Sequence, residues 1–222
     1  MQRDHTKTIL CYGDSNTYGY DPRDGLRYGE EVRWPGVLRR LLGDGYRIIE
    51  EGCNGRTCAH TPAEEEWKDG RPYLPACLNS HKPIDAVVLM LGSNDLKRQF
   101  AAEPETLAEG IGRMLRTIAE FLEIKQGSVP YVLVVSPPLI GEGITASPFA
   151  DSFDADAAPR SQRLAGLYEK TAFDYAQETG NPCGFLDAAV LIDPSPVDSL
   201  HLMPEAHQVL GTAIAQTLRA FL

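Results

Sequence analysis

Short apolar segments, separated by longer segments with helical spacing, constrain the fold of this chain most strongly. Nearly uninterrupted apolar runs are typical of parallel strands that are covered on both faces. The sequence predicts strands over Thr8–Tyr12, Arg47–Glu51, Ala86–Leu91, Tyr131–Ser136 and Cys183–Leu186. Apolar residues that recur on one helical face predict helices over Val32–Leu42, Thr106–Ile124, Leu164–Thr179 and Glu205–Leu222.

Strand and helix alternate along the whole chain, which indicates an α/β sandwich with a parallel sheet. No internal repeat or low-complexity linker interrupts the 222 residues, so we expect a single domain over 1–222. Two irregular stretches, Gly52–His81 and Pro137–Pro159, leave the carboxyl ends of predicted strands. Ligands bind at that edge of an open parallel sheet, so we expect these stretches to form pocket walls.

The charge balance excludes two classes of partner. The chain has 31 acidic and 21 basic residues, a formal net charge of −10, and no basic run. Nucleic acids and anionic membranes both attract positive charge, so we expect neither as a partner. No apolar stretch reaches the length of a membrane span or of a signal-peptide core.

The cysteines favour a reducing compartment. There are five, an odd number, and they are scattered along a chain that is long enough to fold without disulfides. We therefore expect reduced thiols and a cytoplasmic location. Cys53 and Cys58 have no partner pair at zinc-ligand spacing, so we expect no metal site.

The segment Gly13-Asp14-Ser15-Asn16 follows the first predicted strand. A serine on a tight turn at a strand end has a free hydroxyl, and the turn can direct a backbone N–H toward the same point. This pattern suits a catalytic nucleophile. An ordinary surface turn is the alternative, because Gly, Asp and Ser all favour turns.

The segment Asp198-Ser199-Leu200-His201 precedes the last predicted helix, whose start is indicated by Pro204. A serine nucleophile needs a histidine that accepts its proton and a carboxylate that orients the imidazole. Asp198 and His201 are close enough in sequence to form such a pair on one loop. A surface or helix-capping histidine is the alternative.

Two further segments suit donors of hydrogen bonds to an oxyanion. Asn94 lies in Gly92-Ser93-Asn94-Asp95 after the third predicted strand, and its amide can donate into the same crevice as Ser15. Gly55 lies in Gly52-Cys53-Asn54-Gly55-Arg56-Thr57 after the second strand, where its N–H can serve as another donor. A helix cap and a plain turn are the respective alternatives.

The four segments, in this order, resemble the conserved blocks of the SGNH (GDSL-like) hydrolases over essentially the whole chain. Further segments resemble the bacterial arylesterase and acyltransferase group of that superfamily: Glu50-Glu51-Gly52, Arg56-Thr57, Tyr73-Leu74-Pro75, Met90-Leu91-Gly92, Val134–Pro138 and Val32-Arg33-Trp34. The resemblance implies a three-layer α/β/α sandwich with a five-stranded parallel sheet, a flavodoxin-like arrangement.

The resemblance also implies roles for individual residues. Ser15 would be the nucleophile, His201 the base and Asp198 its orienting carboxylate. The oxyanion hole would combine the Ser15 and Gly55 N–H groups with the Asn94 side chain. The family motif usually has leucine after the serine, whereas this chain has Asn16, which makes the adjoining pocket wall more polar.

We expect the substrate pocket to be lined by residues next to these blocks, namely Asp14, Asn16, Ser93 and Lys97. Of the other aromatic and imidazole side chains, Trp34 suits core packing and Trp67 suits either a pocket entrance or the surface. His60, His81 and His207 lack an acidic partner at short spacing comparable to Asp198, so we expect structural or surface roles for them.

The expected activity is hydrolysis of short-chain carboxylic esters, such as aryl or alkyl acetates, through an acyl-enzyme on Ser15. Acyl transfer to an alcohol or to hydrogen peroxide would use the same residues. A carbohydrate or small-molecule O-acetyl esterase is the enzymatic alternative, and a non-catalytic flavodoxin-like binding domain is the alternative of another class. We expect no cofactor, a small-molecule ester as ligand, and a homo-oligomer of unknown order.

Overall fold

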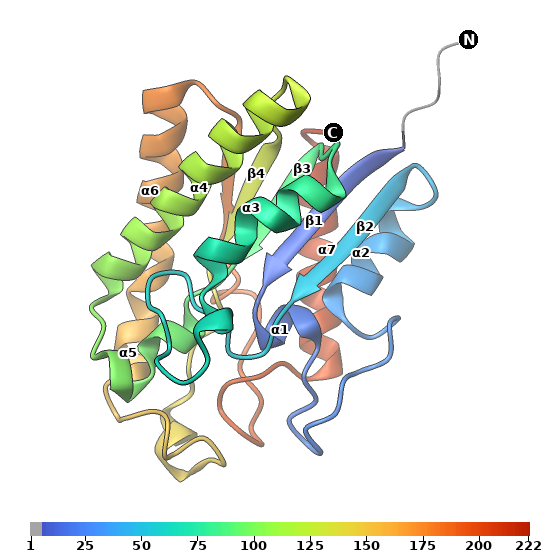
Figure 1. Ribbon diagram of the computed structural model, residues 1–222. Helices are drawn as coiled ribbons and strands as arrows, with labels where there is room; N and C mark the ends of the chain where they lie inside the picture. The colour runs from blue at the N-terminus through green and yellow to red at the C-terminus, as the bar shows by residue number, and fades with distance from the viewer. Residues whose placement is uncertain (1–5) are drawn as a thin grey trace.

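The computed structural model describes residues 6–222 and contains a five-stranded, all-parallel sheet in the order β2-β1-β3-β4-β5 (Figure 1). Each predicted strand is confirmed within two residues. The strands are β1 (Lys7–Gly13), β2 (Tyr46–Gly52), β3 (Ala86–Met90), β4 (Tyr131–Val135) and β5 (Cys183–Leu186). This arrangement confirms the predicted α/β sandwich.

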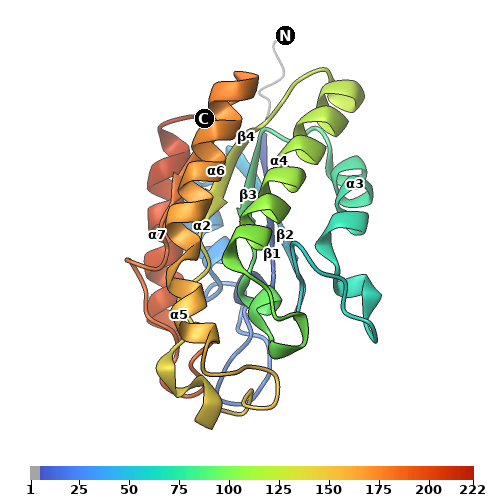
Figure 2. The same ribbon diagram turned by 90° about the vertical axis from the view of Figure 1, so that its left-hand side faces the viewer.

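Helices cover both faces of the sheet (Figures 1 and 2). On one face α3 (Gly70–His81), α4 (Pro104–Gln126) and α6 (Leu164–Thr179) pack together, and on the other α2 (Trp34–Leu42) packs against α7 (Pro204–Arg219). Successive β1 side chains alternate between the two resulting cores: Leu10 and Tyr12 enter one, Ile9 and Cys11 the other. Two covered faces explain why the strands lack polar alternation.

Proline and glycine set the helix ends. Pro104 and Pro204 occupy the first turns of α4 and α7, where a missing N–H costs no hydrogen bond. Gly127 and Gly180 end α4 and α6 in the left-handed region, at φ of 77° and 71°. These signals lie within about two residues of the predicted boundaries.

The prediction of an irregular Gly52–His81 stretch is wrong for its second half, which forms α3. Asp69 caps this helix by accepting from the Arg71 N–H at 3.0 Å, and Leu74, Cys77 and Leu78 are buried at helical spacing. Pro75 lies inside the helix and obscured it in the sequence. The short 3-10 helix η1 (Glu66–Lys68) precedes it.

The Pro137–Pro159 stretch is largely irregular, as predicted, apart from the 3-10 helix η4 (Glu142–Ala146) and the start of α5 (Ala157–Gln162). Three further short elements follow strand ends: α1 (Ser15–Tyr18), η2 (Ser93–Leu96) and η3 (Arg98–Phe100). Within residues 6–222, no helix combines the length and the apolar character that crossing a bilayer requires.

Candidate active site

Ser15 opens α1 directly after β1. Asp14 caps this single turn through its carboxylate, which accepts from the Asn16 N–H at 3.0 Å. A Cβ on Gly13 would lie 2.0 Å from Thr17 Oγ1 and 2.9 Å from the Met90 carbonyl, so only glycine fits there. The turn thus fixes the direction of the Ser15 hydroxyl at the carboxyl edge of the sheet.

The three residues of the predicted triad lie together. His201 Nε2 is 2.9 Å from Ser15 Oγ, and His201 Nδ1 is 2.6 Å from Asp198 Oδ2. All three are buried, with exposed fractions of 6% for Ser15, 3% for His201 and 1% for Asp198. This is the geometry in which an imidazole can take the serine proton while a carboxylate stabilises the resulting imidazolium.

The Asp198 carboxylate is held by its own loop. Its Oδ1 accepts from the Leu200 and His201 N–H groups, each at 3.0 Å, and Ser199 between them adopts a left-handed φ of 60°. Burial raises the pKa of Asp198, but the hydrogen bonds from His201 and the backbone outweigh it, and the net shift is downward. Asp198 is therefore an anion at neutral pH.

Two of the three predicted oxyanion donors are backbone N–H groups that have no partner in the described part of the chain. Within residues 6–222, neither the Ser15 N–H nor the Gly55 N–H donates to a protein acceptor. Gly55 has a φ of 81°, a conformation that favours glycine. The Asn94 amide donates to the Arg56 carbonyl at 3.2 Å and more weakly to Asp14 Oδ2 at 3.4 Å, and this longer bond is the one that a ligand can replace.

Asp95 positions the loop that carries Gly55, a role that the sequence analysis missed. Its fully buried carboxylate accepts from the N–H groups of Cys58 and Ala59, both at 2.9 Å, and from that of His60 at 3.1 Å. It also lies 3.0 Å from His60 Nδ1. The signal available in the sequence was an aspartate directly after the proposed oxyanion amide, close to the end of an apolar strand.

A pocket of about 160 Å³ opens onto Ser15, and we call it the Ser15 pocket. One side, the aromatic wall, is formed by Tyr20, Phe149, Leu200 and His201. The rings of Tyr20 and Phe149 lie 4.2 and 5.2 Å from the His201 ring, centroid to centroid. The rest of the lining, apart from Ser15 itself, is what we call the polar wall: Asn54, Gly55, Lys68, Asn94 and Lys97.

Of the residues predicted to line the pocket, only Lys97 does so. Asp14, Asn16 and Ser93 are buried beneath it, and the prediction is wrong for these three. The Asn16 amide donates to the Leu200 carbonyl at 3.4 Å instead of facing a ligand. Burial raises the pKa of Asp14 to about 6, partly offset by the hydrogen bond from the Asn16 N–H.

His60, His81 and His207 lie outside the Ser15 pocket, as expected. His207 is fully buried in α7, accepts from the Trp34 N–H at 3.3 Å, and has its pKa lowered to about 3 by burial. Trp34 is a core residue, as predicted. Trp67 is 64% exposed and does not line the pocket, which settles its position on the surface.

Within residues 6–222, one group of three side chains is of the types that can bind a metal ion: Glu51, Cys77 and His81. Their potential ligand atoms lie within 4.8 Å of one another. Here Glu51 Oε1 lies 2.8 Å from His81 Nε2, and burial, with the Glu51 charge, raises the pKa of the Cys77 thiol to about 12. A nearby cation, Arg56, contributes a positive potential at Cys77. These groups satisfy one another and take no part in the Ser15 pocket.

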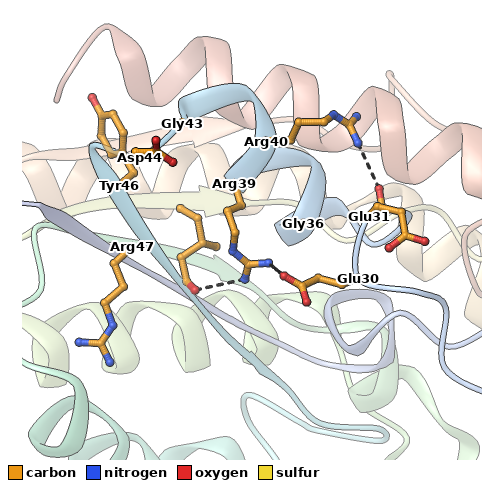
Figure 3. Close-up of a pocket in the computed structure, with 10 residues that line it drawn as sticks. Glu30, Glu31, Gly36, Arg39, Arg40, Gly43, Asp44, Tyr46 and Arg47 are labelled. Atoms are coloured by element: carbon orange, nitrogen blue, oxygen red, sulfur yellow. Dashed lines mark hydrogen bonds and ion pairs between the residues drawn. The ribbon is translucent and has the colours of Figure 1, made fainter.

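A second and larger hollow, of about 750 Å³, lies over α2 and the start of β2. We call it the α2–β2 hollow. Figure 3 shows that Arg39 reaches Glu30 across it and that Arg40 reaches the backbone of Glu31. Arg39 also pairs with the partly buried Glu50 at 3.1 Å. Six of the ten residues that line the hollow are charged, Arg39 and Glu30 among them form an ion pair, and none of the ten is a serine, cysteine or histidine.

Three similar proteins share this architecture or part of this sequence. Est24, a carbohydrate acetylesterase from Sinorhizobium meliloti, is 34% identical with a TM-score of 0.86, over 97% of this chain and 100% of that chain. The native M. smegmatis aryl esterase has the same identity, TM-score and coverage. An acetylxylan esterase from Xylanibacter ruminicola is 27% identical over 115 residues, which are 50% of this chain and 21% of that protein.

The sequence profile of one family extends over most of the chain. The GDSL-like Lipase/Acylhydrolase family matches residues 11–209, a range that includes the serine turn, the oxyanion-donor segments and the Asp198–His201 loop. With the five-stranded parallel sheet and esterases as structural neighbours, this match shows that the chain belongs to the GDSL-like lipase/acylhydrolase family and is a carboxylic ester hydrolase.

Proposed function

We propose that this protein is a serine esterase that hydrolyses short-chain carboxylic esters, aryl or alkyl acetates among them, through an acyl-enzyme on Ser15. The observation that carries the proposal is the continuous contact from Asp198 through His201 to Ser15, at 2.6 and 2.9 Å. The small volume of the Ser15 pocket, about 160 Å³, supports an acyl group of a few carbons.

In the first half-reaction, His201 Nε2 takes the proton as Ser15 Oγ attacks the ester carbonyl carbon. The carbonyl π electrons move to oxygen, and the Ser15 N–H, the Gly55 N–H and the Asn94 amide donate to the oxyanion. Because these donors are fixed before the substrate binds, little reorganisation accompanies the charge that develops. Asp198 stabilises the imidazolium.

The tetrahedral intermediate then collapses. The carbon–oxygen bond to the alcohol breaks, His201 donates its proton to the departing oxygen, and the acyl group remains on Ser15. In the second half-reaction, water attacks the acyl-enzyme with His201 as base, and Ser15 regains its proton when the carboxylic acid leaves. An alcohol or hydrogen peroxide in place of water would give a transferred ester or a peracid.

The test is covalent labelling together with one substitution. An organophosphonate should label Ser15, as read by mass spectrometry of the peptides, and Ser15→Ala should lower kcat for 4-nitrophenyl acetate about 10⁶-fold without lowering Tm. Ser80→Ala, at an exposed serine on α3, is the control and should behave as wild type. Label on another residue, or turnover by Ser15→Ala at the wild-type rate, would overturn the proposal.

Carbohydrate O-acetyl ester hydrolysis is the second candidate. It is supported by the 34% identity to the carbohydrate acetylesterase Est24 and by the hydrogen-bonding groups of the polar wall, which suit a hydroxylated alcohol moiety. Comparing kcat/KM for acetylated sugars and for phenyl acetate distinguishes the two candidates.

The homo-oligomer, the single domain and the cytoplasmic location stay predictions.

A further inference from the structure

Two lysines stand on the polar wall of the Ser15 pocket. Lys68 lies against the proposed oxyanion donor Gly55, since a Cβ added to that glycine would be 3.2 Å from Lys68 Nζ. Lys97 follows η2, the short helix that carries Asn94, and its N–H donates to the Asn94 carbonyl at 3.4 Å. Both lysines therefore line the same pocket as Ser15, beside the proposed oxyanion donors Gly55 and Asn94.

The two lysines differ in their pairing. Lys68 forms an ion pair with Glu65, whose carboxylate is 47% exposed, and lies over the Trp67 ring at 5.2 Å from its centroid. Within residues 6–222, no carboxylate pairs with the Lys97 ammonium, and no acidic residue lines the pocket. The protein as a whole has a net charge of −10, so this cationic wall opposes the general charge of the molecule.

Lys97 is partly buried in this position. Burial and the charge of Lys68 both lower the pKa of Lys97, which means that the ammonium form is destabilised there. The charges of Glu65, Asp14 and Asp95 act in the opposite direction without forming an ion pair with Lys97, and an anion that enters the pocket would supply that direct pair. A pocket of this kind selects a charged ligand over a neutral one of equal shape.

We propose that the preferred substrates are esters that carry a carboxylate, and that Lys97, assisted by Lys68, binds this carboxylate on the polar wall. The inference rests on the proposed esterase function and narrows its substrate class. The Ser15 pocket is small, so the carboxylate lies within a few bonds of the scissile ester. The acyl-enzyme chemistry is unchanged, and the lysines bind the substrate without exchanging a proton with it.

Two matched pairs of esters test the proposal and locate the carboxylate. On the alcohol side, 4-acetoxybenzoate is compared with the neutral 4-acetoxybenzamide. On the acyl side, 4-nitrophenyl hemiglutarate is compared with 4-nitrophenyl pentanoate, after subtraction of non-enzymatic hydrolysis. We expect the charged member of one pair to have a kcat/KM about tenfold higher at low salt, and a smaller advantage at high salt.

The variants assign this preference to the lysine. Lys97→Met should lower kcat/KM for the charged ester about tenfold more than for its neutral partner, and Lys97→Arg should retain the preference. Lys125→Met, which removes an exposed lysine at the end of α4, is the control for net charge and should retain the preference as well.

Three results would overturn the inference: no preference for the charged ester in either pair, an equal loss on both members of a pair, or the same loss in Lys125→Met. An equal loss would mean that Lys97 acts on the oxyanion instead of on a substrate carboxylate. Failure of the wild-type protein to hydrolyse 4-nitrophenyl acetate would contradict the proposed function itself, which separates the two failures.

Discussion

The Ser15 pocket and the α2–β2 hollow differ in a way that volume alone conceals. The hollow is larger, about 750 Å³ against 160 Å³, yet the Arg39 guanidinium in it is already paired with Glu30 and Glu50. In the Ser15 pocket, two lining residues, Ser15 and Gly55, have backbone N–H groups without a protein partner within residues 6–222. Unsatisfied donors, held in place, distinguish a reactive site from a surface depression.

The difference arises from position in the fold. Parallel strands bring Ser15, Gly55 and Asn94 to one edge of the sheet, because β1, β2 and β3 end there side by side. The hollow lies instead over α2 and the amino-terminal part of β2. Substitutions of the proposed triad and oxyanion residues should therefore lower the rate of ester hydrolysis, whereas substitutions in the hollow should not.

The largest effect in this comparison is expected for Asp198→Asn. An amide would not hold the His201 tautomer or stabilise the imidazolium, so kcat for 4-nitrophenyl acetate should fall about 10⁴-fold. Steady-state kinetics at neutral pH measures the loss. Asp193→Asn, at an exposed aspartate of the same loop, is the matched control. A loss of less than tenfold in Asp198→Asn would mean that another group orients the histidine.

Asn94→Ala should have the next largest effect. Removing one of three oxyanion donors should lower kcat by about 10²–10³ with a smaller change in KM. Because the Asn94 amide also donates to the Arg56 carbonyl, a Tm measurement accompanies the kinetics and separates a loss of fold from a loss of rate. Asn79→Ala, at an exposed asparagine on α3, should match the wild type. An unchanged kcat would remove Asn94 from the oxyanion hole.

Asp14 should make stability depend on pH in a defined window. Burial raises its pKa from 3.8 to about 6, so between these pH values the folded state keeps a proton that the unfolded state releases. The free energy of unfolding should therefore fall as pH rises from about 4 to 6, by about 3 kcal/mol at most from this group.

Asp14→Asn tests this expectation because an amide does not titrate. The free energy of unfolding is measured by denaturant titration at pH 4, 5, 6 and 7. The value for Asp14→Asn minus the value for the wild type should increase as pH rises, while Asp193→Asn should follow the wild-type curve. A difference between Asp14→Asn and wild type that is the same at pH 4 and pH 7 would show that Asp14 ionises with its ordinary pKa in the folded protein.

Strand positions could be predicted from the sequence because both faces of the sheet are covered. Residues such as Val88 and Leu133 have no polar neighbours to interrupt the apolar run. Helix α3 could not be predicted, since Gly70 and Pro75 have low helix propensity and the apolar face of the helix has only three large residues. Tertiary packing of Leu74, Cys77 and Leu78 against the core overrides that propensity.

The residues of the proposed triad and oxyanion hole could be identified in the sequence for a different reason: each lies within a few residues of a strand end or a helix start. The pocket walls could not, because they depend on loops that meet only in three dimensions. Tyr20 and Phe149 are 129 positions apart, yet their rings lie 6.2 Å apart and both contact His201. Lys68 belongs to a loop of charged residues that reads as solvated surface, and its contact with Gly55 fixes it in the pocket.

The smallest effect is expected in the α2–β2 hollow, where Arg40→Ala should leave both stability and activity almost unchanged. Arg40 is exposed, donates to the Gln208 side chain at 2.7 Å and to the Glu31 carbonyl at 3.4 Å, and faces solvent that replaces both contacts. Stability should change by less than about 0.5 kcal/mol, and kcat/KM for 4-nitrophenyl acetate should match the wild type. A tenfold change in kcat/KM would couple this hollow to Ser15 and break the distinction between a surface depression and a pocket with unpaired backbone donors.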